Sequence, residues 1–324
     1  MPPDRIGSAQ PGQTPTAGDP ALLVLGPLTL QGDAGEVRLG GAKPRRLLAA
    51  LALNAGQMVP ADRLIDIAWG DSPPRTARQN LHTYLWSLRR SLAAATGRRL
   101  VIQGRPPGYL LRITAGDLDW HVFRDLCSAA ARCPSSDPAA AGRLLRKALG
   151  LWRGPALADI ADGLPLLGAW AAAIEEERLT VVERRIQADL AAGWHRELTS
   201  ELAVLAAAYP FREQFRAHQM VALYRCGRQA EALAAFHQLR GQLADELGVD
   251  PSPKLNRIYE AILRADTALD WPTQKPQAPA QRATIASAPP IAEPEQRKRG
   301  TYLTRVSHTP QTARVANHKA STRS

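Results

Sequence analysis

The stretch RTARQNLHTYLWSLRRSL, residues 75–92, decides the fold of the first part of this sequence. Its apolar residues recur at helical spacing, so that one stripe of a helix can be buried. They are Leu81, Tyr84, Leu85, Leu88 and Leu92. At about 100° per residue, the opposite side carries Arg75, Thr76, Gln79, Thr83, Trp86 and Arg90. The stretch therefore predicts a helix that packs through its leucines and presents arginines, hydroxyl groups, an amide and an indole ring outward.

Short patterned segments surround this helix. They predict antiparallel strands at residues 21–30 and 36–41, helices at 43–56 and 60–70, and a second pair of strands at 99–104 and 108–113. In the second helix, Asp62 is in place to cap the N-terminus. A basic, proline-stiffened turn at residues 105–107 joins the last two strands. This order is that of a winged helix-turn-helix with an N-terminal antiparallel sheet, in which the polar side of the third helix is free for the major groove of DNA.

Residues from about 117 to 266 are patterned almost entirely as helices separated by short turns. The predicted helices lie within 119–133, 139–152, 164–193, 195–209, 212–227, 229–248 and 253–266. Gly193 and Gly227, each followed by a Glu-containing apolar segment, lie 34 residues apart, which is the period of tetratricopeptide helix pairs. The fold class is therefore mainly α, with a winged-helix domain at 21–113 followed by an all-α tetratricopeptide-like domain at 114–268.

Positive charge is concentrated in two segments of this chain of 324 residues. Residues 21–113 carry 13 Lys and Arg against 5 Asp and Glu, residues 114–274 carry 18 against 21, and residues 275–324 carry 9 against 2. Basic segments attract phosphate polyanions such as nucleic acid, and the alternative is that the surplus arginine serves solubility.

The two ends of the chain lack apolar periodicity. Residues 1–20 and the basic tail at 269–324 are rich in proline and small or polar residues, and we expect both to be disordered. Within the tail, the run Arg297-Lys298-Arg299 either adds non-specific attraction to DNA or is simply solvated. There is no apolar run long enough for a membrane helix and no signal-peptide pattern at the N-terminus, so we expect a cytoplasmic, nucleoid-associated protein without a membrane partner.

Nothing in the sequence predicts an enzyme, a metal site or a cofactor. The cysteines, Cys127, Cys133 and Cys226, form no zinc-binding pattern and are interpreted as reduced structural residues. The histidines are dispersed, and Glu175-Glu176-Glu177 is better explained as a solvated helix face than as an acid and base pair. No phosphate-binding GxxxxGK[ST] motif occurs, so nucleotide hydrolysis is not expected.

The exposed side of the helix at 75–92 and its neighbours supply the candidate DNA contacts. Arginine offers paired donors to guanine or phosphate, amides pair with adenine, and threonine reaches phosphate or a thymine methyl. The candidates are Lys43, Arg45, Arg75, Thr76, Arg78, Gln79, Asn80, His82, Thr83, Trp86, Ser87, Arg89, Arg90, Arg105 and Tyr109. For the arginines the alternative is an ordinary charged helix face. A lone histidine such as His82 is more often a polar surface residue, and Tyr109 fits a packing role.

Ordered blocks of this sequence resemble the Streptomyces antibiotic regulatory protein family, which joins an OmpR-like winged helix to a bacterial transcriptional activation domain of tetratricopeptide-like helices. The blocks, between roughly residues 22 and 268, are LGG-K-RRLLA-L, DRLID-WGD-PP-TA, NLHTYLWSLRRSL, PPGYLLRI, LWRGPALADI, GRQAEALAAFHQLRGQLADELGVDPSP and AILRAD.

The resemblance implies a DNA-binding transcriptional activator. Such proteins bind direct repeats in promoters of secondary-metabolite (antibiotic) clusters, commonly as a side-by-side homodimer, and recruit RNA polymerase. The loop that relatives present to polymerase and sigma factor corresponds here to Trp69, Gly70, Asp71, Ser72, Pro73 and Pro74. The helical domain is regulatory or dimer-forming in that family.

The sequence departs from the family pattern at Trp86-Ser87, where relatives carry a small polar residue followed by a basic or polar one. Trp86 either contacts thymine methyl groups or belongs to a protomer or polymerase interface.

A second hypothesis belongs to another class of function. The long run of helix pairs is compatible with a helical-repeat scaffold whose main partner is a protein, with the basic N-terminal domain binding nucleic acid or an acidic surface. The basic hairpin after the third helix separates the two hypotheses, because a scaffold has no need for it.

Overall fold

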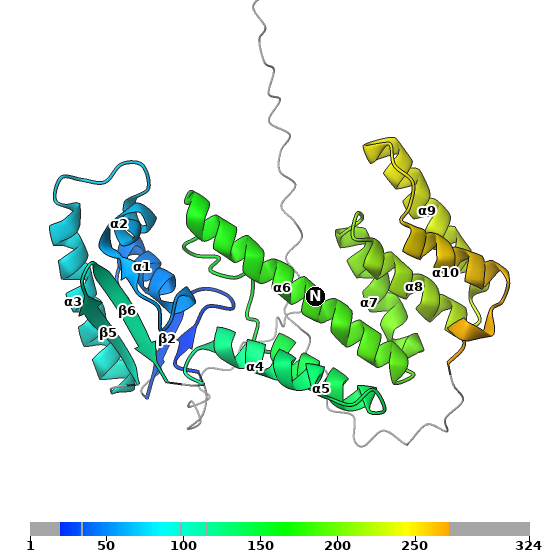
Figure 1. The fold of residues 1–324 in the computed structure, drawn as a ribbon, viewed down its shortest axis with the longest axis horizontal. Coiled ribbons are helices and arrows are strands. Elements are labelled where there is room, and N and C mark those ends of the chain that lie inside the picture. Colours follow the sequence, from blue (N-terminus) through cyan, green and yellow to red (C-terminus); the bar gives the residue numbers. More distant parts are fainter. Residues whose placement is uncertain (1–19, 34, 98, 115, 272–324) are drawn as a thin grey trace, which may run out of the picture. The chain divides into compact units, whose positions relative to one another are not determined.

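The computed structural model of the chain describes residues 20–33, 35–97, 99–114 and 116–271. This part of the chain is mainly helical, with two small antiparallel sheets near its N-terminal end, as the sequence predicts (Figure 1). None of the helices in these ranges is long and apolar enough to cross a membrane. The described residues extend to Trp271, which is the third residue of the predicted tail. The indole Nε1 of Trp271 donates to the Ala191 carbonyl at 3.0 Å. The run Arg297-Lys298-Arg299 lies outside the described residues.

The N-terminal part begins with a sheet of three short strands. They are β1 (Leu22–Leu23), β2 (Thr29–Gly32) and β3 (Gly35–Val37), paired antiparallel in that order. The prediction of one strand over residues 21–30 was wrong, because Gly26, with φ +142°, and Pro27 break that run. The strand predicted at 36–41 pairs only as far as Val37.

Three helices and a second sheet follow. The helices are α1 (Ala42–Leu53), α2 (Ala61–Trp69) and α3 (Ala77–Thr96), and the second sheet has the order β4 (Val59–Pro60), β6 (Gly108–Ile113), β5 (Leu100–Arg105). Strand β4 is an addition to the predicted elements. α3 begins two residues later than predicted, so that Arg75 precedes it and Thr76 is its N-cap residue.

The predicted cap of α2 was also wrong. Its N-cap residue is Pro60, and Asp62 lies in the first turn without a capping bond. The first amide of the helix, on Ala61, instead donates to the Pro107 carbonyl of the hairpin at 3.1 Å. A distant backbone group therefore satisfies one of the amides left open at the start of this helix.

The remaining described chain consists of helices joined by short turns. They are α4 (Asp119–Ala131), α5 (Pro138–Leu149), α6 (Pro165–Ala191), α7 (His195–Ala208), α8 (Glu213–Arg225), α9 (Gln229–Leu247), α10 (Pro253–Leu263) and a 3-10 turn, η1 (Thr267–Leu269). Successive helices α4, α5 and α6 pack on one another, as do α7, α8 and α9, and α10 packs on α8 and α9. Two of these helices are capped at their N-termini by a nearby side chain. Asp137 accepts from the Ala140 amide at 2.9 Å at the start of α5, and Ser252 accepts from the Leu255 amide at 3.4 Å at the start of α10.

The main hydrophobic core crosses the boundary predicted at residues 113 and 114. One continuous cluster of buried residues runs from Ala21 in the first sheet to Val181 in α6. At the crossing, the Asp119 carboxylate at the start of α4 accepts from the buried amides of Val24 at 2.8 and 2.9 Å and Leu25 at 2.9 Å. The winged-helix part and the first helices of the helical part therefore share one core.

Candidate nucleic-acid interface

Helix α3 is held in place by the apolar stripe that its sequence predicts. Leu81, Leu85, Leu88 and Leu92 are all at most 1% exposed. Tyr84 lies at the edge of the stripe, where its ring stacks on that of Trp69 at 5.9 Å between centroids. The stripe packs on α1, α2 and β5, which directs the other side of the helix to solvent.

The outward side of α3 carries most of the predicted contact residues. Its exposed residues include Arg78, Gln79, His82, Thr83, Trp86, Ser87 and Arg90. The Trp86 side chain is 61% exposed, and the Arg90 guanidinium carbon lies 5.8 Å from the centre of its indole ring. The Thr83 hydroxyl donates to the Gln79 carbonyl at 3.2 Å, which turns its polar atom toward the backbone.

Two side-chain pairs organise the start of α3. The Asn80 amide donates to the Thr76 hydroxyl at 3.1 Å, so these two residues of the predicted DNA-contact set bind each other. Arg78 donates to Asp62 at 2.6 Å, with side chains 71% and 74% exposed. A pair so exposed to water is weakly held and exchanges readily with other partners.

The hairpin of β5 and β6 forms the wing beside α3. Arg105, at its tip, is exposed and stands opposite Gly108 in the strand register. Tyr109 is buried, at 8% exposed, and its hydroxyl lies 3.0 Å from Nδ1 of His82. Arg89 donates through Nε to the Ile102 carbonyl at 2.9 Å. His82, Arg89 and Tyr109 therefore join helix to wing.

The basic residues that open α1 separate into different roles. Arg45 donates to the Leu28 carbonyl at 2.7 Å and forms an ion pair with Asp159. Its guanidinium is thus engaged within the chain, and we leave it out of the proposed DNA contacts. Lys43 is half-buried, with its ammonium 5.5 Å from the centre of the Trp69 ring.

The loop between α2 and α3 is anchored at one end and exposed over the rest. Trp69 is half-buried between Tyr84 and Lys43, and Gly70 ends α2 with φ +63°. The four residues Asp71-Ser72-Pro73-Pro74 are exposed, and in Figure 1 this loop projects from the helices on either side.

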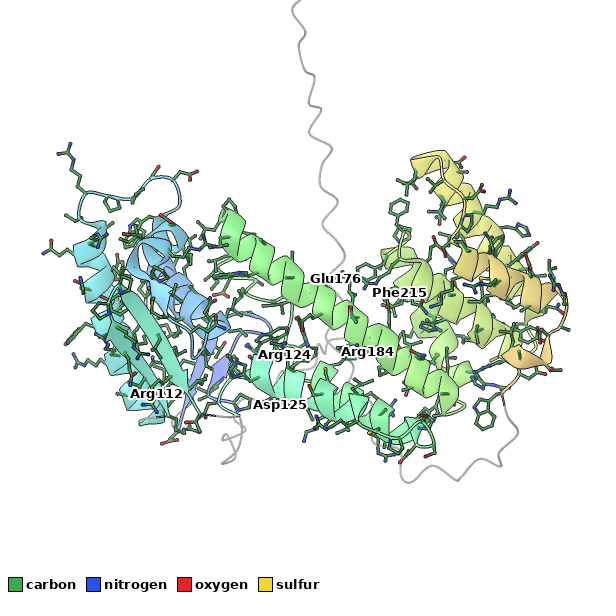
Figure 2. All side chains as sticks on the ribbon, viewed as in Figure 1. Arg112, Arg124, Asp125, Glu176, Arg184 and Phe215 are labelled. Carbon is green, nitrogen blue, oxygen red and sulfur yellow. The ribbon has the colours of Figure 1, made fainter. Side chains whose placement is uncertain are left out.

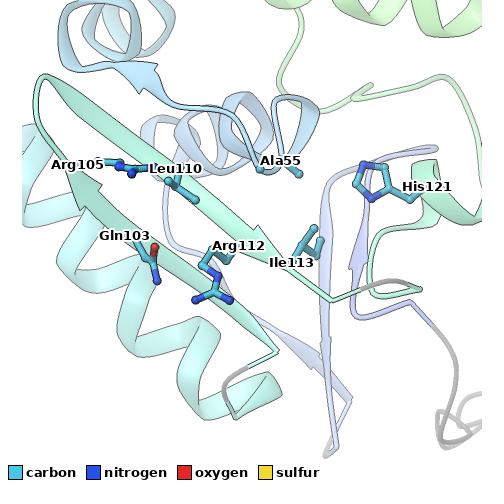
Figure 3. A pocket seen from close by; sticks show the side chains of 8 residues that line it. Ala55, Gln103, Arg105, Leu110, Arg112, Ile113 and His121 are labelled. Carbon is cyan, nitrogen blue, oxygen red and sulfur yellow. The ribbon is translucent and has the colours of Figure 1, made fainter.

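A shallow hollow of about 640 Å³ lies beside the wing, on the face of the hairpin away from α3 (Figure 3). It is lined by Ala55, Gly56, Gln103, Arg105, Leu110, Arg112, Ile113 and His121. Partial burial lowers the pKa of His121, so the ring is neutral at physiological pH and the positive charge here comes from Arg105 and Arg112. Arg112 was not among the predicted contacts, although its alternation with the buried Leu111 places it on the outer face of the strand.

Two of the three consecutive glutamates of the helical part make structural bonds. Glu176 of α6 accepts from Arg212 at 2.7 and 2.9 Å, and Glu175 accepts from the Ala156 amide at 2.8 Å. The triple glutamate is therefore more than a solvated helix face; Figure 2 marks Glu176 on α6. Burial lowers the pKa of both His195 and His218 to about 4, so both are neutral at pH 7. Among the described residues, no group of His, Cys, Asp and Glu is arranged to hold a metal ion.

Two family models match the chain in succession. The model described as "Transcriptional regulatory protein, C terminal" matches residues 35–111, which include the three helices and most of the wing. The model described as "Bacterial transcriptional activator domain" matches residues 118–263, from the start of α4 to the end of α10.

The chain is similar to proteins named as regulatory proteins or transcriptional regulators. The regulatory protein DnrI of Streptomyces peucetius is 39% identical over 274 residues, covering 82% of this chain and 99% of DnrI. The transcriptional regulator RedD of Streptomyces coelicolor is 37% identical, covering 82% of this chain and 77% of RedD. The regulatory protein AfsR of the same species is 41% identical over 80% of this chain, which spans 26% of AfsR.

A solved structure shows the same fold. Mycobacterium tuberculosis EmbR, in complex with a low affinity phosphopeptide, superposes with a TM-score of 0.72 at 33% identity, covering 78% of this chain and 66% of EmbR. The succession of family matches, the near-complete coverage of DnrI and this structural likeness agree with one another. The chain belongs to the Streptomyces antibiotic regulatory protein family of transcriptional activators.

Proposed function

We propose that this chain binds promoter DNA of an antibiotic biosynthetic cluster and recruits RNA polymerase to it. The observation that carries the proposal is the exposed stripe Gln79, Thr83, Trp86 and Arg90 on α3, beside a wing with Arg105 at its tip. An α-helix fits the major groove, and a wing placed in this way reaches the adjacent backbone or minor groove. The net charge of residues 21–113 favours the same partner.

The exposed residues divide by the chemistry that they offer. Gln79 has the amide needed for adenine, and Arg90 has paired donors for guanine or phosphate. Arg75 and Arg78 are exposed cations around the start of α3, and the half-buried Lys43 lies near the start of α1. All three are suited to phosphate. Arg112 on the outer face of the wing adds a further cation to the same part of the molecule. Base contacts would then come from the middle of α3 and backbone contacts from its margins.

Polymerase contact is assigned to the loop after α2. The exposed residues 71–74 follow Trp69, whose packing fixes one end of the loop, and the family resemblance assigns the same segment to polymerase and sigma factor. Two copies bound side by side on direct repeats one helical turn apart would present both loops on one side of the DNA.

A mobility-shift titration of the full chain against the promoters of its own gene neighbourhood tests DNA binding. Arg90→Ala should weaken binding about tenfold, or about 1.4 kcal/mol, and lower the salt slope by about one if the contact is a phosphate. Arg240→Ala, at an exposed arginine of α9 paired with Asp250 at 3.7 Å, is the matched control and should bind as the wild type does. The absence of any salt-sensitive, sequence-preferring complex would refute the proposal.

A second experiment separates DNA binding from activation. Asp71→Ala changes the exposed loop without touching α3 or the wing. In transcription assays with purified polymerase, we expect this variant to lose activation while keeping its affinity for the promoter. Full activation by Asp71→Ala, together with that of a Ser72→Ala variant, would remove the loop from the mechanism.

A further inference from the structure

Attraction to the phosphate backbone of DNA does not explain why Trp86 lies on the exposed face of α3. Its side chain is 61% exposed in the middle of a polar face, whereas Trp69 and Trp152 pack into the fold. An indole ring adds no charge for phosphate and has only one polar group, an N–H donor. Its large apolar surface therefore favours an apolar feature of the partner.

The neighbours of Trp86 sharpen its chemistry. One turn earlier, the Thr83 hydroxyl is directed at the Gln79 carbonyl at 3.2 Å, which leaves its methyl group as the part available for contact. One turn later, the Arg90 guanidinium carbon lies 5.8 Å from the indole centre, within the range of a cation–π interaction. The face thus places an apolar pair next to an arginine whose position the indole restricts.

The major groove offers one apolar group on its base edges, the C5 methyl of thymine, and one base with two acceptors for arginine, guanine. Successive bases lie about 3.4 Å apart along a strand. A separation of 5.8 Å between indole and guanidinium therefore spans one to two base steps.

Resting on the proposed function, we propose that Trp86 and the Thr83 methyl read a thymine methyl, while Arg90, held by the indole, binds a guanine within two base pairs of it. Trp86 is then a specificity-determining residue of this chain. It adds base discrimination without adding to the salt-dependent part of the affinity, because it binds no phosphate.

The test uses the duplex that the full-length chain selects from a random-sequence pool, resynthesised with deoxyuridine in place of single thymines. This replacement removes the methyl group and leaves base pairing and the O4 acceptor in place. At the contacted thymine we expect about a fourfold loss of affinity, the equivalent of about 0.8 kcal/mol for one buried methyl group. Other thymines should be insensitive.

Variants connect this loss to the indole. Trp86→Ser should bind the thymine and uracil duplexes equally, with an unchanged salt slope, and Trp86→Phe should keep a preference for thymine. Trp194→Ser, the same change at a 43% exposed indole outside the DNA-binding part, should discriminate as the wild type does. Thermal melts confirm that each variant is folded.

The outcomes that overturn the inference differ from those that overturn the proposed function. A chain that selects no duplex at all refutes DNA binding itself. A selected site without a thymine near guanine, or equal wild-type affinity for every uracil duplex, refutes the role of Trp86 alone. Thymine discrimination that survives in Trp86→Ser, with a loss of dimer or polymerase binding, assigns the indole to a protein interface instead.

Discussion

Substitution of Gly108 by alanine tests how the wing is attached to the rest of the winged-helix part. Gly108 stands opposite Pro60 where β4 pairs with β6. A Cβ atom at this position would lie 2.0 Å from the Val59 carbonyl oxygen and 2.8 Å from the Pro60 Cα. Both neighbours are backbone atoms, so no side-chain rotation can relieve the overlap.

The size of the effect follows from that overlap. A carbon and a carbonyl oxygen in close contact lie about 3.3 Å apart, so β4 would have to move by more than 1 Å, roughly, from β6. That shift strains the bonds on either side of β4, from the Gly56 amide to Leu111 at 2.9 Å and from Ala61 to Pro107 at 3.1 Å. With about 0.5–1.5 kcal/mol for each of the two bonds and about 1–3 kcal/mol for overpacking, we expect a loss of about 2–6 kcal/mol.

Thermal and urea unfolding measure this loss. At about 2–4 °C per kcal/mol for a large domain, Tm should fall by about 4–24 °C. DNA affinity should fall as well, because the wing is displaced from α3. Gly104→Ala in the same hairpin is the control: its Cβ would lie no closer than 3.6 Å to Arg89 Nη2, an ordinary contact. Equal stability of the two variants, within about 0.5 kcal/mol, would refute the reasoning.

Three further predictions concern charge and pH. Asp62→Ala releases Arg78 from an exposed ion pair, so DNA affinity should rise about twofold and its salt dependence should steepen. The free energy of unfolding should stay unchanged within about 0.5 kcal/mol. Lower DNA affinity would contradict this prediction. Burial lowers the pKa of His218 to about 4, below the unfolded value of 6.5. The contribution of His218 to the free energy of unfolding is therefore present above pH 6.5 and is lost as pH falls toward 4. In urea titrations, the wild type should lose about 2 kcal/mol between pH 7 and pH 5 that His218→Gln does not lose. For Asp119, burial outweighs the hydrogen bonds from the Leu25 and Val24 amides and raises the pKa to about 6. Protonated Asp119 therefore contributes to the free energy of unfolding at low pH, and this contribution is lost as pH rises through 6. Asp119→Asn should abolish a gain of about 1 kcal/mol in the free energy of unfolding from pH 7 to pH 5, and an unchanged pH profile would contradict this assignment.

Periodic features of the sequence predicted most of the architecture. The stripe from Leu81 to Leu92 requires one buried face on α3, and the structure buries it. Successive apolar patterns located each helix of the C-terminal part to within a few residues. These elements follow from local spacing, because a helix satisfies its backbone groups within its own segment.

Pairings between distant residues were not predictable in the same way. Strand β4 is two residues long, and only its partner β6 identifies it as a strand. Asp119 has the sequence context of an ordinary first-turn acid, yet it binds amides 94 and 95 residues earlier in the chain.

The candidate site shows the same division between local and distant signals. Helical angles placed Gln79, Trp86 and Arg90 on the exposed face of α3. The bond between His82 and Tyr109 depends on how the wing closes on the helix, and no local pattern reveals it.

The core that continues from Ala21 to Val181 has a consequence for protein engineering within this family. A chimera that exchanges specificities by joining two relatives at residues 113 and 114 would combine mismatched halves of one packed interior, and the bonds from Asp119 to Val24 and Leu25 would cross the junction. A cleaner exchange transplants only the solvent-facing positions of α3 and the wing tip into an intact recipient. On the proposed function, promoter specificity in this fold is transferable as a set of side chains and not as a segment of chain.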